Sequence, residues 1–193
     1  MSWFQIRIKR ILILAAMAFT VSSMVSAVFV ESTQAEDWES YKPAHSLGSG
    51  DDDWWTVYPS QSEKAGQSVE QSDWVVKALK EKPLVVLVHS NSCAPCVVQM
   101  ANMEKVMAIY GNEITYRDLL GEGSGLKEAT EFLKIYSTSR RLVVPTTVFF
   151  TLIEGPDGKA EVAWHSVEDA MSEEDVTDYV KDAIYYSRLN SGS

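Results

Sequence analysis

Two neighbouring apolar runs of different period stand out in the pattern of hydrophobic and polar positions. Residues 84–88 form a short run rich in β-branched side chains, which is typical of a strand buried on both faces. Residues 97–110 repeat apolar side chains at helical spacing, namely Val97, Met100, Ala101, Met103, Val106, Met107 and Tyr110. The pattern therefore predicts a strand-to-helix junction over residues 90–96.

The rest of the pattern predicts a helix up to residue 80, then a strand over 114–120 and a helix over 126–136 after this junction. Residues 142–150 form a second strongly apolar strand, and alternation over 160–165 predicts its hairpin partner. Ser172 and Asp175 resemble a capping box that opens a closing helix. The order predicts an α/β fold with parallel strands, a C-terminal β-hairpin and helices that flank a central sheet.

The N-terminal part has a different character. Three basic residues, Arg7, Lys9 and Arg10, precede an apolar run over residues 11–30. This pattern predicts a signal peptide or an N-terminal membrane anchor over residues 1–35, with small-residue cleavage sites after Ala27 and Ala35. Cleavage and retention both place the remainder outside the cytoplasm, as a periplasmic, secreted or membrane-anchored domain.

Residues 36–67 are rich in Ser, Gly, Asp and Gln, and we interpret most of them as an acidic, polar linker. Its aromatic residues could form an edge strand or pack on the domain. Residues 68–189 are then the folded domain, and 190–193 are a polar tail. After residue 35 the chain holds 14 basic and 26 acidic residues, a net charge of −12, which disfavours nucleic acid and anionic lipid surfaces as partners.

The chain has only two cysteines, Cys93 and Cys96, at the predicted start of a helix. Free N–H groups and the helix dipole favour a thiolate there, so we assign attack to Cys93 and resolution of the mixed disulfide to Cys96. A zinc site would need two further ligands, and haem attachment would need a histidine where Val97 stands. We therefore expect redox chemistry with no metal and no cofactor.

The succession of strand, C-x-P-C, helix, strand, helix and a Val144-Pro145-Thr146 motif before a hairpin resembles the thioredoxin family over roughly residues 68–189. The resemblance implies a thioredoxin-like fold with a mixed sheet. It also implies that Pro145 is cis and lies beside the cysteines, and that the Val144 backbone pairs with an extended substrate. Ala94 and Pro95, which would also face the substrate, match members that act as reductants.

Two positions depart from the family pattern. Leu87 stands where many members have a buried acid, and Ser92 stands where tryptophan is usual. His89 could take over proton transfer, or it could be a hydrogen-bonded structural residue. Extra length around residues 121–125 or 137–141 could shape a partner surface or be neutral.

The leading hypothesis is an extracytoplasmic thiol–disulfide oxidoreductase that reduces disulfide-containing proteins and is recharged by an unidentified electron donor. Two alternatives stay open. One is a redox-inactive interaction module that binds through its acidic surface and aromatic N-terminal segment. The other is a Cu(I) carrier that would add Met100, Met103 and Met107 to the cysteines.

Overall fold

The computed structural model describes residues 37–48 and 50–190. The predicted signal peptide or anchor and the last three residues of the predicted tail lie outside the described residues. Among the residues that are described, no helix is both long enough and apolar enough to cross a membrane.

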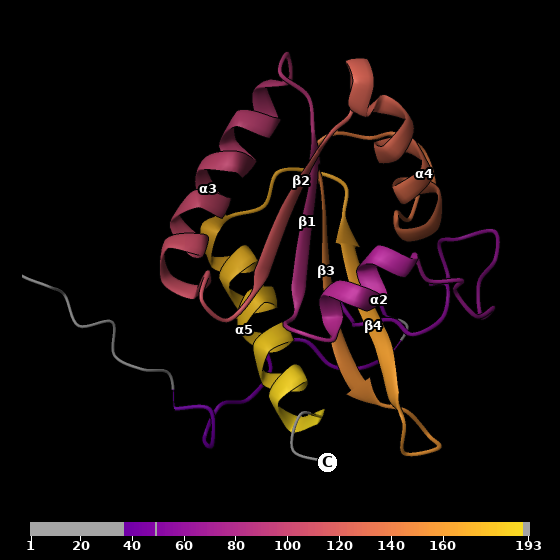
Figure 1. The fold of residues 1–193 in the computed structure, drawn as a ribbon, viewed down its shortest axis with the longest axis vertical. Coiled ribbons are helices and arrows are strands. Elements are labelled where there is room, and N and C mark those ends of the chain that lie inside the picture. The colour runs from indigo at the N-terminus through magenta and orange to yellow at the C-terminus, as the bar shows by residue number, and fades with distance from the viewer. Residues whose placement is uncertain (1–36, 49, 191–193) are drawn as a thin grey trace, which may run out of the picture. The chain divides into compact units, whose positions relative to one another are not determined.

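Four strands form one mixed sheet in the order β2-β1-β3-β4 (Figure 1). They are β1 (Leu84–His89), β2 (Thr115–Leu120), β3 (Thr146–Glu154) and β4 (Ala160–Val167). β1 runs parallel to β2, whereas the pairs β1–β3 and β3–β4 are antiparallel. The predicted parallel unit, hairpin and mixed sheet are confirmed.

Helices cover both faces of this sheet. α3 (Ala94–Tyr110) and α5 (Glu173–Asn190) lie on one face, and α2 (Asp73–Leu79) and α4 (Leu126–Tyr136) lie on the other, with a short 3-10 turn η1 (Gly123–Gly125) before α4 (Figure 1). Alternate β1 side chains enter the two layers, and all six residues of the strand are buried. Double coverage explains why β1 is apolar throughout and does not alternate.

The apolar face of α3 differs from the predicted stripe. Val97 was expected to face the core, but 58% of its surface is exposed. The buried residues are Cys96, Gln99, Met103 and Val106, at helical spacing from the second cysteine. The face of α3 that packs on the core is thus the one that carries Cys96, and the neighbouring Val97 lies on the solvent side.

Residues 37–67 also depart from the linker that their composition predicts. Trp54 and Trp55 are buried, and the Trp55 backbone exchanges hydrogen bonds of 2.8 and 2.9 Å with Trp164 on β4. This short antiparallel bridge covers the outer edge of β4. Burial of the two large indole rings outweighs the flexible, polar residues around them. The opposite edge of the sheet is β2, which pairs with β1 and with no second strand among the described residues.

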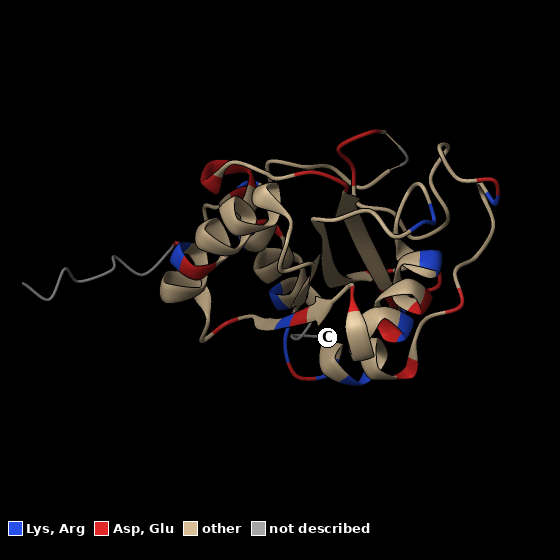
Figure 2. Cartoon of the chain, turned by 90° about the horizontal axis from the view of Figure 1, so that it is seen from above, with Lys and Arg blue, Asp and Glu red and all other residues tan. Residues whose placement is uncertain are grey.

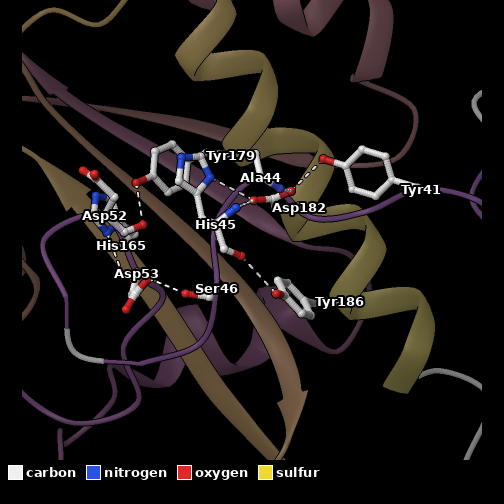
Figure 3. A network of polar contacts seen from close by, with 10 residues as sticks. All are labelled: Tyr41, Ala44, His45, Ser46, Asp52, Asp53, His165, Tyr179, Asp182 and Tyr186. Atoms are coloured by element: carbon white, nitrogen blue, oxygen red, sulfur yellow. Dashed lines mark hydrogen bonds and ion pairs between the residues drawn. The ribbon is translucent and has the colours of Figure 1, made fainter.

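A network centred on Asp182 fastens this segment to α5 (Figure 3). The carboxylate of Asp182 is fully buried and accepts hydrogen bonds from the Tyr41 hydroxyl (2.6 Å), the Ala44 N–H (2.9 Å), the His45 N–H (2.9 Å) and the His45 Nδ1–H (2.8 Å). The Tyr186 hydroxyl donates to the His45 carbonyl at 3.1 Å. Four donors to one carboxylate compensate its buried charge.

His165 on β4 extends the same arrangement. Its Nδ1–H donates to the Asp53 carbonyl at 2.9 Å, and its ring stacks on Tyr179 with centroids 4.5 Å apart. Burial lowers the pKa of His165 to about 4. His165 is therefore neutral at pH 7, and it acts as a hydrogen-bonded core residue.

Candidate active site

The two cysteines lie where β1 leads into α3. Cys93 is the N-cap residue of α3, and Cys96 lies in its first turn; the two are joined by a disulfide. Cys93 is half-buried, whereas Cys96 is fully buried. Solvent and a second protein can therefore reach the first sulfur only, as the assigned order of attack requires.

Groups at the start of α3 can stabilise negative charge on Cys93. The Cys96 N–H donates to the Cys93 sulfur at 3.1 Å, and Pro95 has no N–H to leave unsatisfied in this first turn. The positive end of the helix dipole adds to this hydrogen bond. Both effects favour a Cys93 thiolate once the disulfide is opened.

The loop before β3 closes on the same sulfur. The Val144–Pro145 peptide bond is cis, and the Val144 carbonyl oxygen lies 3.6 Å from the Cys93 sulfur. The Thr146 hydroxyl donates to the Val143 carbonyl at 2.8 Å and fixes this turn. The structure therefore brings together Cys93, Cys96, Val144 and Pro145, and Ala94 and Pro95 are exposed beside them.

His89 lies at the end of β1, and its side chain points to the α3 face of the sheet, like that of Leu87. Its Nε2 lies 3.3 Å from a carboxylate oxygen of Asp118 on β2. Its Nδ1 is buried and has no hydrogen-bond partner within residues 37–48 and 50–190. A buried ring nitrogen without a partner is costly in a folded core, and the Trp54 indole N–H is a second such group among the described residues.

An acid near the position of Leu87 comes from the neighbouring strand. Leu87 is fully buried, and its register partner on β2 is Asp118. The Asp118 side chain is 63% exposed. Sequence reasoning looked for an acid on β1 alone and missed this one, because the register of two parallel strands is not visible in a single sequence.

Gln99 is a second residue that sequence reasoning missed. It is fully buried, its side-chain N–H donates to the Thr147 hydroxyl at 2.9 Å, and its side-chain oxygen accepts the Met171 N–H at 2.7 Å. These bonds join α3 to β3 and to the start of α5. The only signal in the sequence was its position one helical turn after Cys96.

The glycine-rich loop after β2 lies against the cysteine loop. Glu122 accepts the Asn91 N–H at 2.8 Å, and the Gly121 N–H donates to the His89 carbonyl at 2.7 Å. A side chain at Gly121 would meet that carbonyl at 3.2 Å and Val144 at 3.3 Å. The loop therefore contacts both the cysteine loop and the segment that carries Val144.

This arrangement of sheet, disulfide and cis-proline decides the fold. The fold is thioredoxin-like. No protein-family model matches the sequence, and no curated protein matches it.

Solved structures with this thioredoxin-like fold do match. Mitochondrial thioredoxin 3 from Saccharomyces cerevisiae is 16% identical with a TM-score of 0.39, over 57% of this chain and 87% of that one. Thioredoxin O2 from Arabidopsis thaliana is 18% identical with a TM-score of 0.37, over 53% and 76%. Thioredoxin-2 of the malaria parasite is 17% identical with a TM-score of 0.40, over 52% and 82%.

Proposed function

We propose that this chain is an extracytoplasmic thiol–disulfide oxidoreductase that reduces protein disulfides with Cys93 and Cys96. The observation that carries the proposal is the asymmetry of the pair. Cys93 is half-exposed and receives an N–H at the start of α3, while Cys96 is buried behind it. The location rests on the apolar run over residues 11–30.

The reaction proceeds by two thiol–disulfide exchanges. The Cys93 thiolate attacks one sulfur of the substrate disulfide, and a mixed disulfide forms as the other substrate sulfur leaves and takes a proton. The Cys96 thiolate then attacks the Cys93 sulfur and releases the second substrate thiol. Two electrons pass to the substrate, and the enzyme is left with the Cys93–Cys96 disulfide, which an external dithiol donor must reduce.

We assign substrate binding to the backbone around cis-Pro145 and proton transfer to His89. By its resemblance to thioredoxins, the Val144 backbone pairs with an extended substrate beside cis-Pro145, and Ala94 and Pro95 contact it. His89 takes the proton from the Cys96 thiol before the second exchange. Support for this role is its buried Nδ1, which has no partner in the described part of the chain.

The two alternatives receive less support from the packing. Trp54 and Trp55, which the interaction-module hypothesis needed for binding, are buried. Met103, which the copper hypothesis placed near the cysteines, is 1% exposed and packs in the core with Val106. A methionine at such a position is typical core filler.

Reduction of insulin disulfides by the full chain, with dithiothreitol as the electron donor, tests the proposal. We expect wild-type turnover, a rate at the uncatalysed background for Cys93→Ser, and unchanged turnover for the neighbouring control Ser92→Ala. Absorbance of the thiolate should titrate with a Cys93 pKa below the ordinary value of about 8.5. A wild-type protein without turnover, or a Cys93 pKa at or above that value, contradicts the proposal.

A further inference from the structure

A basic hollow lies beside the loop that carries cis-Pro145. It has a volume of about 570 Å³, and its lining residues are Gln61, Glu63, Lys134, Thr138, Ser139, Arg140 and Arg141. Three of these seven are basic, in a chain with a net charge of −10 whose Asp and Glu residues are spread over helices and loops (Figure 2). An adjoining hollow shares Lys134 and Arg140 and adds Lys64 together with two acidic residues, Glu70 and Asp73.

The positive charge of the basic hollow is poorly neutralised. Lys134 and Arg141 are exposed and form no ion pair with any other residue in the described ranges. Arg140 has one acidic partner, Glu63, at 3.6 Å, and the Glu63 side chain is 93% exposed. An ion pair of this length and exposure contributes little and is easily displaced. The basic hollow thus offers an unsatisfied site for anionic groups.

Its loop is held in place from two sides. The Ser139 N–H donates to the Glu168 carboxylate at 2.6 Å, and the Arg140 Nε–H donates to the Lys134 carbonyl at 3.4 Å. These bonds present the basic side chains on a fixed backbone. Because Glu168 is engaged with that backbone N–H, it adds to the anchoring of the loop.

The basic hollow is close to the reacting sulfur. Arg141 precedes Val144 by three residues, so their Cα atoms are at most about 11 Å apart. The Val144 carbonyl lies 3.6 Å from the Cys93 sulfur. The distance from the Arg141 Cα to the Cys93 sulfur is therefore at most about 17 Å, which about five extended residues span. A segment bound at Cys93 can therefore place side chains in the basic hollow.

We propose that the basic hollow binds acidic side chains near the reacting cysteine of the substrate protein, and so favours disulfides in acidic segments. This inference rests on the proposed reductase function and names its substrate class. Substrate carboxylates take the place of Glu63 at Arg140 and add contacts to Arg141 and Lys134. Such contacts on an exposed rim raise the rate of encounter and fix the register of the bound segment.

The test uses two disulfide peptides that are identical except for Glu or Gln at the three positions that follow one cysteine and the three that precede it. For the wild-type chain we expect kcat/KM about threefold to fivefold higher for the Glu peptide, and a ratio that approaches one in 1 M salt. Equal kcat/KM for the two peptides at low salt would overturn the inference.

Two variants should move this ratio in opposite directions. Arg141→Gln lowers it toward one, and Glu63→Gln raises it about twofold because a competing carboxylate is removed. Lys159→Gln, which removes an exposed lysine from the turn between β3 and β4, is the control of equal charge and should leave the ratio unchanged. The inference fails if Arg141→Gln slows both peptides equally, as a purely structural role predicts.

Failure of the proposed function looks different, because the wild-type chain would then reduce neither peptide. In that case fluorescence anisotropy with a labelled Glu peptide decides the inference separately. Binding that weakens in Arg141→Gln but not in Lys159→Gln upholds the basic hollow as an acidic-segment site. No binding, or binding that is independent of Arg141, overturns it.

Discussion

Two polar sites in this molecule differ in how completely their histidine is hydrogen-bonded. At Asp182, the carboxylate receives four hydrogen bonds, and the His45 ring is fixed by one of them. At the cysteine end of the sheet, His89 has one longer contact to Asp118 and a buried Nδ1 that lacks a partner among the described residues. The Asp182 carboxylate is thus fully engaged, whereas the His89 ring is not.

The difference separates a group that holds the fold from a group to which we assign a role in the proposed reaction. A buried carboxylate with every lone pair satisfied stabilises the folded state, and losing it leaves several donors unpaired. A buried nitrogen without a partner costs stability, and it is tolerated where proton exchange uses it. The Asp182 network should therefore respond to mutation through stability, and the cysteine site through rate.

The largest effect should come from Asp182→Asn. The amide NH2 group replaces one of the two oxygens, so it faces either the Tyr41 and Ala44 donors or the two His45 donors. We expect the free energy of unfolding to fall by about 3–5 kcal/mol. Urea denaturation measures it, with Glu174→Gln, an exposed residue of α5, as the control. Amide exchange at Ala44 and His45 should quicken as the segment loosens. A loss below about 1 kcal/mol would contradict a stabilising role for the network.

The next effect concerns the pH dependence of stability. His165 is neutral in the folded state down to its pKa of about 4, whereas in the unfolded chain it takes up a proton near 6.5. The unfolded state binds more protons between these values, so the free energy of unfolding falls as pH drops from 6.5 toward 4. The contribution is at most roughly 3 kcal/mol.

His165→Phe removes that proton-binding difference. Urea denaturation of both proteins at pH 7.5 and pH 4.5 should show a smaller loss for the variant, so the stability gap between the two narrows at low pH. Subtraction of the wild-type values cancels the acid sensitivity of carboxylates that do not interact with His165, such as Asp157, whose pKa is lowered chiefly by a hydrogen bond from the Lys159 side chain. Parallel pH curves for the two proteins would show that His165 does not cause the dependence.

The smallest effect concerns His89 at the cysteine site. His89→Gln should slow the attack of Cys96 on the mixed disulfide by roughly tenfold to 100-fold, because a proton acceptor is lost, with little change in stability. Rapid-mixing kinetics of mixed-disulfide resolution at several pH values measures this step. Formation of the mixed disulfide by Cys93 provides the internal control. Equal slowing of both steps would make His89 a structural residue.

Much of the fold could be predicted because its elements depend on local patterns. The β1 run, the α4 helix and the hairpin follow from hydrophobic period and turn residues. The N-cap half of the predicted capping box is confirmed, since the Ser172 hydroxyl accepts the Asp175 N–H at 3.0 Å. The same hydroxyl donates to the Asp175 carboxylate at 2.7 Å. The cis peptide at Pro145 and the fold class followed from the resemblance to thioredoxins.

What could not be predicted depends on contacts between distant segments. The segment before residue 68 has a linker-like composition, and only its contact with β4 shows that Trp54 and Trp55 are buried. Asp118 comes close to His89 through strand register, and Gln99 is buried because Thr147 and the Met171 N–H satisfy it. Side-chain polarity alone would place Gln99 on the surface.

The uncovered edge at β2 also bears on how copies of this chain meet. Suppose that β2 pairs antiparallel with β2 of a second copy. Side chains that lie opposite each other in such a pair are on the same face of the sheet. The pairing is therefore centred on one residue, which lies opposite the same residue of the other copy. At the middle of β2 that residue is Arg117 or Asp118. Like charges directly opposed across two strands are destabilising. Arg117 and Asp118 therefore disfavour aggregation through pairing at the β2 edge. The β4 edge is protected in another way, because the segment around Trp55 covers it.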